Sequence, residues 1–272
     1  MSLTGAARVA GIVGAPVTHS LSPFLHGRWI AAAGLDAAYV PFACPPDRFA
    51  TFIEGLRGGT IVGLNITAPF KREALAIAHT ATKEARACGS ANLLLFHPDG
   101  TIEARSTDGY GVLTALARRA PALTPAQGPA TILGAGGAAA AAAAALVGAG
   151  WKVQLVARTP ATAQAVAAAT GAGLYAWDDC GTALAEAALL INAVPGDPQI
   201  TSSPGIAAFD MSYTGHDTPF LARATGPRIH GIDMLIAQAE PSFEAFYDVP
   251  PPPIDQRVAA VRILTGSLKP AS

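Results

Sequence analysis

Hydrophobic and polar positions along the first third of the chain alternate between two kinds of segment. Short apolar runs, typical of buried strands, are separated by stretches with the spacing of amphipathic helices. The pattern predicts strands over Arg8–Gly14, Ala37–Cys44 and Ile61–Thr67, a hairpin of Ala91–Phe96 and Thr101–Arg105 around Asp99-Gly100, and helices over Phe24–Ala33, Pro46–Leu56, Lys71–His79 and Thr82–Cys88. This alternation predicts an α/β layer with mostly parallel strands and one antiparallel pair.

A second alternating series follows helix Gly109–Arg119 and a loop rich in Pro and Gly at Ala120–Pro129. The pattern there predicts strands over Ala130–Leu133, Trp151–Ala157, Ala188–Val194 and Ile206–Tyr213, and helices over Gly137–Val147, Pro160–Ala169, Asp233–Phe246 and Ile254–Gly266. A fresh βαβ start predicts a second α/β domain. We therefore expect a first domain over 1–108, completed by a C-terminal helix at about 240–272, and a second over 109–239.

Composition narrows the class of partner. The formal net charge is -1 and only 14% of residues are charged, so no basic field attracts nucleic acid or an anionic membrane surface. The uncharged stretch Pro129–Trp151 is long enough to span a bilayer, but its Ala and Gly residues are weakly apolar, which favours a soluble helix. The chain start lacks the pattern of a signal peptide, and three scattered cysteines without CxxC spacing indicate a reducing cytoplasm and no metal site.

A glycine-rich turn stands at the start of the second series. Residues Gly134–Ala139 satisfy G-x-G-x-x-G/A, directly after strand Thr131–Leu133 and at the start of a helix. Glycines let the backbone approach a pyrophosphate, and the helix N-terminus offers unpaired N–H groups. The alternative is a plain turn before an Ala-rich helix. Strand, spacing and helix agree, so the sequence favours dinucleotide binding.

The end of the next strand carries information about the kind of dinucleotide. NAD-binding sites place Asp or Glu near this point to bind the ribose 2′-hydroxyl. This chain has Arg158 and Thr159 there and no acid, which favours NADP. An exposed arginine at a strand end is the ordinary alternative. Hydroxyls of Thr159 and Thr162 offer further phosphate contacts.

Polar clusters in the first half follow predicted strands. Ser20 and Ser22 offer two hydroxyls from one loop, able to bind a carboxylate, although Ser22 before Pro23 is also typical of a helix N-cap. Lys71 follows the strand that ends at Thr67, where a surface lysine is the ordinary alternative. Asp108 stands where it can cap a helix.

Asn92 stands alone in an apolar strand, where a buried amide needs hydrogen-bond partners. Beside a dinucleotide fold, Lys71 and Asp108 suggest an acid–base pair. Oxidation of a secondary alcohol requires removal of a proton as the hydride leaves. A partly desolvated lysine can remove that proton, and a nearby aspartate can orient the lysine and tune its pKa.

The order of these motifs resembles that of the shikimate dehydrogenase family over about Arg8 to Phe246. The segments that carry the resemblance are Gly14–Pro23, Asn65–Lys71, Gly89–Asn92, Ser106–Gly109, Gly134–Ala138, Asp210–Tyr213 and Gly231–Gln238. Seven motifs in one order make the resemblance specific.

The resemblance implies an N-terminal α/β substrate domain and a Rossmann-like dinucleotide-binding domain, with the active site in the cleft between them and the last helix returning to the first domain. It implies reversible NADPH-dependent reduction of 3-dehydroshikimate to shikimate, in the chorismate and aromatic amino-acid pathway, by a cytoplasmic monomer or homodimer with a small-molecule substrate and no metal.

The resemblance also assigns roles to individual residues. It makes Lys71 and Asp108 the catalytic pair. Ser20, Ser22 and Tyr213 hold the carboxylate, and Thr67, Asn92 and Gln238 bind ring hydroxyls. On the cofactor side, Gly134, Ala135, Gly136, Gly137 and Ala138 hold the pyrophosphate, Arg158 and Thr159 the 2′-phosphate, and Gly231 and Met234 lie near the nicotinamide.

Some positions depart from the family pattern. Ala157 stands where the family often has Asn, and Thr162 where it has a second basic residue, which leaves NAD or dual cofactor use open. Ser106 and the segment Pro195–Asp197 also differ. Two alternatives therefore remain: a quinate or quinate/shikimate dehydrogenase, and a non-catalytic sensor of a shikimate-pathway metabolite. Retention of Lys71 and Asp108 argues against the sensor, which needs no acid–base group.

Overall fold

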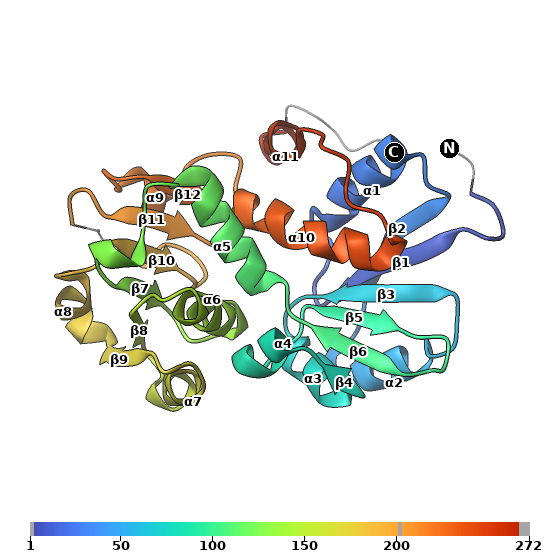
Figure 1. Cartoon of the computed structure of the whole chain (residues 1–272), viewed down its shortest axis with the longest axis horizontal. Helices are drawn as coiled ribbons and strands as arrows, with labels where there is room; N and C mark the ends of the chain where they lie inside the picture. The colour runs from blue at the N-terminus through green and yellow to red at the C-terminus, as the bar shows by residue number, and fades with distance from the viewer. Residues whose placement is uncertain (1–2, 201–202, 267–272) are drawn as a thin grey trace. The chain divides into compact units, whose positions relative to one another are not determined.

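The computed structural model describes residues 3–200 and 203–266, which form two compact units (Figure 1). Unit 1 contains the residues up to Thr107 together with Gln238–Gln256. Unit 2 contains Asp108–Ala237 and the described residues from Arg257 on. The sequence predicts that a helix at about 240–272 completes the first domain. By backbone contacts Gln238–Gln256 group with unit 1, and the described residues from Arg257 on group with unit 2. Each unit is built on its own sheet, so the α/β class is confirmed.

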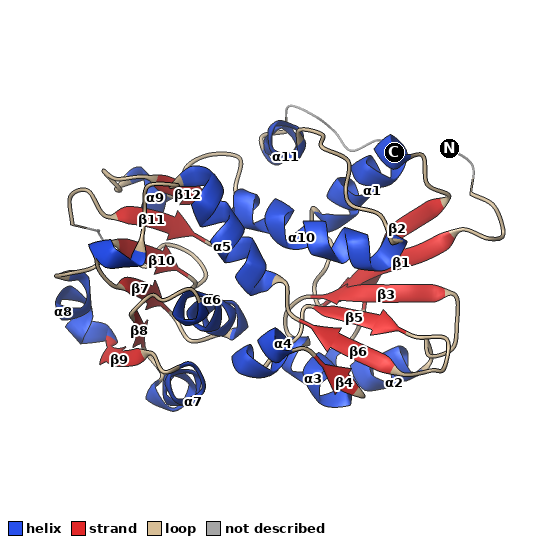
Figure 2. Cartoon of the chain, viewed as in Figure 1, coloured by secondary structure: helices blue, strands red, loops and turns tan. Residues whose placement is uncertain are grey.

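Unit 1 is built on a six-stranded mixed sheet in the order β2-β1-β3-β5-β6-β4 (Figure 2). The strands are β1 (Arg8–Gly14), β2 (Ala37–Ala43), β3 (Ile61–Ile66), β4 (Thr80–Ala81), β5 (Leu93–Phe96) and β6 (Ile102–Arg105). Strand β1 pairs in parallel with β2 and β3, whereas β5 is antiparallel to β3 and β6. The carboxyl ends of β1, β3 and β6 therefore lie at the same sheet edge as the beginning of β5. The predicted hairpin is confirmed, and the two-residue β4 was not predicted.

Five helices contribute to unit 1: α1 (Ser22–Ala33), α2 (Phe49–Glu54), α3 (Lys71–Ile77), α4 (Lys83–Cys88) and the part of α10 (Gly231–Tyr247) from Gln238 on. The helix predicted to begin at Pro46 begins at Phe49, because Pro46–Arg48 form a short 3-10 turn. Phe49 and Phe70 are fully buried, and their rings stack with centroids 4.4 Å apart. This packing anchors the residue before Lys71 in the core.

A buried histidine lies in the aromatic core of unit 1. The His26 ring is stacked on Tyr39 with centroids 4.0 Å apart, and it also contacts Trp29, Phe243 and Phe246. Both ring nitrogens are buried and lack a hydrogen-bond partner among the described residues. Burial disfavours the charged imidazolium and lowers the pKa of His26 from 6.5 to about 3. The folded protein therefore holds this histidine neutral.

We expect His26 to make the stability of unit 1 depend on pH. Its folded-state pKa lies below the unfolded value, so its contribution is complete above about pH 6.5 and is lost as the pH falls toward 3. Between pH 7.5 and pH 5, this group alone should lower the free energy of unfolding by about 2 kcal/mol. His26→Phe keeps an aromatic ring and should remove that loss. Urea unfolding of both proteins at the two pH values measures it, with exposed His19→Phe as control; equal losses in wild type and His26→Phe would refute it.

Unit 2 is built on a fully parallel six-stranded sheet in the order β12-β11-β10-β7-β8-β9. The strands are β7 (Ala130–Leu133), β8 (Val153–Ala157), β9 (Gly173–Ala176), β10 (Leu189–Asn192), β11 (Ala207–Asp210) and β12 (Arg228–His230). The chain starts in the middle at β7, adds β8 and β9 on one side, and then crosses back to β10. This is the strand order of the Rossmann fold, whose ligands bind at the carboxyl ends of the strands where the order reverses. Strands β9 and β12 were not predicted.

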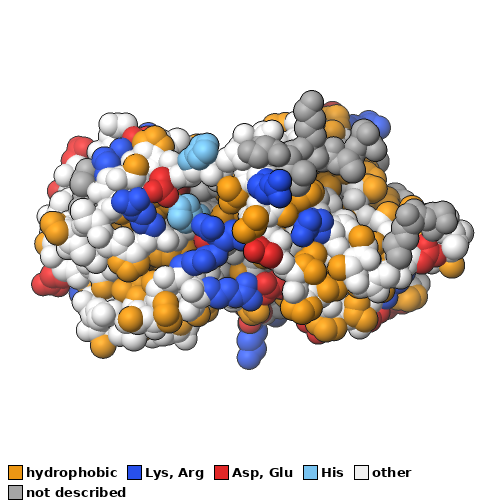
Figure 3. All heavy atoms as spheres, turned by 90° about the horizontal axis from the view of Figure 1, so that it is seen from above, with side chains coloured by type: hydrophobic (Ala, Val, Ile, Leu, Met, Phe, Trp, Pro, Cys, Tyr) orange, Lys and Arg blue, Asp and Glu red, His pale blue; other side chains and the backbone are white. Residues whose placement is uncertain are grey.

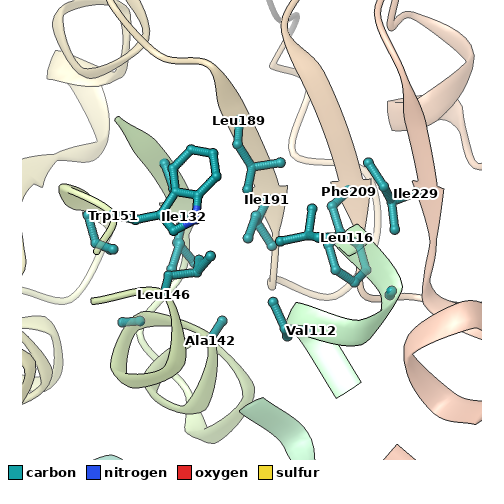
Figure 4. Close-up of a cluster of buried hydrophobic side chains, with 14 of the residues drawn as sticks. Val112, Leu116, Ile132, Ala142, Leu146, Trp151, Leu189, Ile191, Phe209 and Ile229 are labelled. Atoms are coloured by element: carbon teal, nitrogen blue, oxygen red, sulfur yellow. The ribbon is translucent and has the colours of Figure 1, made fainter. Parts of the chain in front are cut away.

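Small residues let the helices of unit 2 approach one another closely. These helices are α5 (Asp108–Arg119), α6 (Gly137–Gly148), α7 (Pro160–Thr170), α8 (Cys180–Leu184), α9 (Pro219–Ala222), the first turns of α10, and α11 (Gln256–Leu264). A Cβ on Gly109 in α5 would lie 2.8 Å from the Cβ of Ala145 in α6. Figure 4 shows Leu116 of α5 and Leu146 of α6 facing Ile132 and Ile191 of the sheet. The Ala-rich run is thus a helix of the core.

The outer surface carries charges of both signs. On the face drawn in Figure 3, Lys and Arg side chains lie beside Asp and Glu side chains, so positive charge is partly balanced there. Ion pairs of unit 2 include Arg119 with Asp233 at 2.6 Å and Arg228 with Asp217 at 2.6 Å. Within 3–200 and 203–266, no helix has the length and apolar character needed to cross a membrane.

Candidate functional site

Six of the predicted site residues belong to unit 1, and five of them gather at one edge of its sheet. Ser20 and Ser22 follow β1, Thr67 follows β3, Lys71 opens α3, and Asn92 directly precedes β5. Because β1 and β3 are parallel and β5 is antiparallel to β3, these positions share one edge. The sixth residue, Gln238, comes from α10 and reaches Asn92 through a hydrogen bond.

Neither Ser20 nor Ser22 is the N-cap residue of helix α1. Helix α1 begins at Ser22, its N-cap is Leu21, and no side chain caps it. The Ser20 hydroxyl accepts a hydrogen bond from the Ser22 N–H at 3.2 Å. Ser22 is buried and Ser20 half-buried. The alternative in which Ser22 caps the helix is therefore wrong, and the Ser22 hydroxyl is not used for capping.

The loops after β1 and β3 are held together by backbone contacts. The Thr67 N–H donates to the carbonyl of Val13 at 3.0 Å, and the Ala15 N–H donates to the carbonyl of Ala68 at 3.2 Å. A Cβ on Gly14 would collide with the methyl group of Thr67. Glycine at position 14 is therefore needed for this close approach, which brings the serine loop beside Thr67.

Lys71 is the first residue of α3 and is half-buried. Its carbonyl accepts a hydrogen bond from the Ala91 N–H at 2.8 Å, which ties the lysine backbone to the segment before Asn92. Phe70, fixed in the core, precedes it. Lys71 therefore stands on a fixed backbone at the sheet edge that carries the other predicted site residues of unit 1.

Asn92 is the centre of a buried polar network. Its Nδ2 donates to Thr107 Oγ1 at 2.9 Å and to Gln238 Oε1 at 3.1 Å, and its Oδ1 accepts from the Thr107 N–H at 2.8 Å. Thr107 Oγ1 in turn donates to Gln238 Oε1 at 3.2 Å. The expectation that the buried amide of Asn92 needs partners is confirmed. Two of the predicted ring-hydroxyl ligands, Asn92 and Gln238, are thus in direct contact, and Thr107, which was not predicted as a site residue, bonds to both.

A second buried amide, Asn65, holds the backbone of Asn92 at this sheet edge. Asn65 Oδ1 accepts from the Tyr39 hydroxyl at 2.8 Å, and its Nδ2 donates to Ser242 Oγ at 3.0 Å and to the Asn92 carbonyl at 3.2 Å. These contacts link β2, β3 and α10 and fix the backbone of Asn92. This role of Asn65 was not predicted; its signal, a lone amide in an apolar strand, is of the kind that was noted for Asn92.

The remaining substrate-side and nicotinamide-side residues belong to unit 2. Asp108 is buried at the first position of α5, and Tyr213 is half-buried after β11. Gly231 opens α10, and a Cβ there would lie 2.5 Å from the Met211 carbonyl oxygen. Met234 is buried in the hydrophobic core of unit 2. The pairing of Lys71 with Asp108 stays a prediction.

The segment before Tyr213 is fixed by Asp210 at the end of β11. Asp210 is buried, and its Oδ1 accepts from Asn192 Nδ2 at 3.1 Å and from the Ser212 N–H at 3.0 Å. Its Oδ2 accepts from the Thr218 hydroxyl at 2.6 Å. These bonds join the carboxyl ends of β10 and β11, where a Rossmann fold binds its ligand.

An open pocket lies at the same carboxyl edge of the sheet, beside β7 and β8. It is lined by Gly134, Ala135, Gly136, Ala157, Arg158, Thr159, Trp177 and Val194. Gly134 has a φ of 111°, a conformation that favours glycine. Gly136 is the N-cap of α6, and a Cβ there would meet no protein atom within 4 Å. Gly137 and Ala138 follow as the first residues of α6, so the pocket faces a helix N-terminus, which attracts a phosphate group.

Arg158 and Thr159 lie where the sequence places them, at the end of β8. Arg158 is exposed, and its Cζ lies 4.4 Å from the centroid of the Trp177 ring. Thr159 is the N-cap of α7, and its side chain makes no capping hydrogen bond. A glycine turn, a helix N-terminus, an arginine and a hydroxyl fit a phosphorylated dinucleotide. Trp177 and Val194, which follow β9 and β10, were not predicted as site residues.

Comparisons with known proteins agree with this architecture. The family model of the shikimate dehydrogenase substrate binding domain matches residues 12–94. Shikimate dehydrogenase (NADP(+)) of Caulobacter vibrioides is 48% identical over 97% of this chain and 98% of its own length. The enzyme of the same name from Acidiphilium cryptum is 41% identical over 92% of this chain and 94% of its own.

Solved structures agree as well. Shikimate 5-dehydrogenase of Thermus thermophilus in complex with shikimate has a TM-score of 0.84 and 31% identity, covering 94% of this chain and 99% of that one. The same enzyme in complex with NADP(H) and shikimate has a TM-score of 0.77 and 28% identity, covering 96% of this chain and 99% of that one. Similarity of this extent, together with the polar sheet edge and the dinucleotide pocket, shows that the chain belongs to the shikimate dehydrogenase family.

Proposed function

We propose that this protein is an NADP-dependent oxidoreductase that interconverts 3-dehydroshikimate and shikimate. In the reducing direction, 3-dehydroshikimate, NADPH and a proton give shikimate and NADP⁺. The observation that carries the proposal is the near full-length identity of 48% to a relative named shikimate dehydrogenase (NADP(+)). The polar side chains at the sheet edge of unit 1 suit a polyhydroxy substrate, and the pocket of unit 2 suits the phosphates of a dinucleotide. Both support the same assignment.

When bound, the nicotinamide supplies the hydride, and the protein supplies binding and proton transfer. We assign the proton transfer to Lys71 Nζ, with Asp108 orienting the amine. In the reducing direction the protonated amine donates its proton to the carbonyl oxygen, where the negative charge of the forming alkoxide develops. In the oxidising direction the neutral amine removes the hydroxyl proton as the hydride leaves.

The other side chains bind and orient the ligands. We assign the carboxylate to the hydroxyls of Ser20, Ser22 and Tyr213, and ring hydroxyls to Thr67, Asn92 and Gln238. The Asn92–Thr107–Gln238 network supports the second assignment, because a fixed network holds its amide groups in one orientation and lowers the cost of ordering them on binding.

On the cofactor side, we assign the pyrophosphate to the turn Gly134–Ala138, the 2′-phosphate to Arg158 and Thr159, and the nicotinamide side to Gly231 and Met234. We further propose a substrate-binding domain over 1–108, completed by a C-terminal helix at about 240–272, and a dinucleotide-binding domain over 109–239. The sequence favours a cytoplasmic enzyme, monomeric or homodimeric, and gel filtration decides between these two states.

The direct test is the rate of cofactor reduction at fixed shikimate, with NADP and with NAD, and again with quinate. Rapid reduction with shikimate and NADP alone is the expected result. Comparable rates with quinate or NAD would assign the protein to a quinate/shikimate or dual-cofactor branch of the family. No reduction with any pair would refute the enzymatic assignment.

Arg158→Ala should raise the KM for NADP about tenfold, since a charge-assisted hydrogen bond to a phosphate contributes on the order of 1.5 kcal/mol or more. The KM for NAD, which has no 2′-phosphate, should change little. Lys152→Ala removes the same charge from the amino end of the same strand β8 and is the matched control. Initial rates with both cofactors measure the ratio, and a parallel change in both KM values would contradict the assignment of Arg158.

A further inference from the structure

Trp177 lines the pocket of unit 2, and the proposed function assigns it no role. It follows β9 in a short 3-10 turn, Trp177–Asp179, and lines the pocket together with Gly134 and Arg158. The indole is half-buried and packs against the hydrophobic cluster that contains Leu133 and Val156. Its ring is therefore held by the core of the sheet, whereas Arg158, which contacts it, is exposed.

The contact between Arg158 and Trp177 is a cation–π interaction. The guanidinium carbon lies 4.4 Å from the ring centroid, well inside the distance of about 6 Å at which such contacts are attractive. In the described part of the chain no carboxylate pairs with Arg158, and the acidic neighbours Asp178 and Asp179 make no ion pair with it. The guanidinium keeps its full charge and its N–H groups for an anion.

Fixing this guanidinium has a consequence for binding. An unrestrained arginine side chain loses rotamer freedom when it binds a phosphate. An arginine that is already stacked on an aromatic ring has lost part of that freedom before binding, so the entropic cost of binding is smaller. The chain has threonine at position 162, so no second basic side chain stands one helical turn after Arg158. The strength of the single arginine therefore depends on how well it is oriented.

We propose that Trp177 is a positioning residue for cofactor selectivity: its ring holds the Arg158 guanidinium at the pocket and so raises the preference for a 2′-phosphorylated dinucleotide. The inference rests on the proposed function, in which Arg158 binds the 2′-phosphate. It predicts that Trp177 strengthens the binding of NADP through Arg158 and has little effect on the binding of NAD.

The test is a double-mutant cycle read by calorimetric titration of NADP and NAD into wild type, Trp177→Ala, Arg158→Ala and the double variant. Trp177→Ala should weaken NADP about three- to fivefold, as expected for an exposed cation–π contact, and NAD by less than about twofold. In the Arg158→Ala background, Trp177→Ala should have no further effect on NADP. Trp177→Phe keeps a π-face and should restore most of the affinity for NADP.

Leu174→Ala, an exposed apolar truncation on β9, is the matched control, and thermal melting checks that each variant is folded. Equal weakening of NADP and NAD by Trp177→Ala, or additive effects in the double variant, would overturn the inference. If Arg158→Ala itself leaves the ratio of NADP to NAD affinity unchanged, the assignment of the 2′-phosphate site fails instead. The two failures are therefore distinguishable.

Discussion

Replacing Lys71 by alanine should reduce turnover by about a hundredfold or more, because general acid–base catalysis contributes on the order of 10² to 10⁴ in rate. The lysine is half-buried at the start of α3, and its backbone is fixed between the buried Phe70 and the hydrogen bond from Ala91. The substitution removes the amine and leaves these anchors in place. Binding of shikimate should change far less than kcat, since the ring hydroxyls and the carboxylate keep their proposed partners.

Initial rates of NADP reduction and thermal melting of the same samples measure this prediction. Lys83→Ala, which removes an exposed lysine at the start of α4 in the same unit, is the matched control and should keep full activity. Asp108→Asn should also lower kcat. The double variant should be about as slow as the slower of the two single variants, because the effects of two residues that act as a unit are not additive. Unchanged turnover in Lys71→Ala would rule out the mechanism.

The sequence predicted most of the fold because buried strands of both sheets are short apolar runs. Strands β7, β8, β10 and β11 are fully buried and were found from their patterns. Strand β9 is mostly exposed at the edge of its sheet and has no such run, and β12 has three residues. Neither leaves a hydrophobic signal, so pairing with a neighbouring strand decides their conformation.

Site residues could be proposed from the sequence where they stand in motifs, as Ser20, Lys71 and Gly134 do. Thr107 also stands in such a motif, Ser106–Gly109, but the motif does not reveal that its backbone N–H and hydroxyl form one network with Asn92. Trp177 reaches Arg158 only because β8 and β9 are neighbours in the sheet. Contacts of this kind join segments that are distant in the sequence, and no local pattern encodes them.

The second large effect is expected at Gly136, which lines the pocket of unit 2 and leaves open space beside its backbone. A Cβ at this position would meet no protein atom within 4 Å, and its φ of -76° is accessible to alanine. Gly136→Ala should therefore fold normally. Its methyl group would point into open space at the first turn of α6, where the motif requires the backbone to approach the pyrophosphate. A displacement of about 1 Å in a bound ligand can cost on the order of a hundredfold in rate, so we expect a loss of that size in kcat/KM.

Gly134→Ala is the contrasting variant, because the constraint at that position comes from the protein itself. Its φ of 111° and a Cβ distance of 3.0 Å to Val194 Cγ1 predict a loss of stability of about 1–3 kcal/mol. Gly136→Ala should instead lose activity at nearly unchanged melting temperature. Its loss should be equal for NADP and NAD, since both contain the pyrophosphate, whereas variants of Arg158 should separate the two. A Gly136→Ala protein with wild-type kcat/KM would mean that the pyrophosphate does not approach this turn, and the cofactor would then have to be placed elsewhere along the carboxyl edge of the sheet.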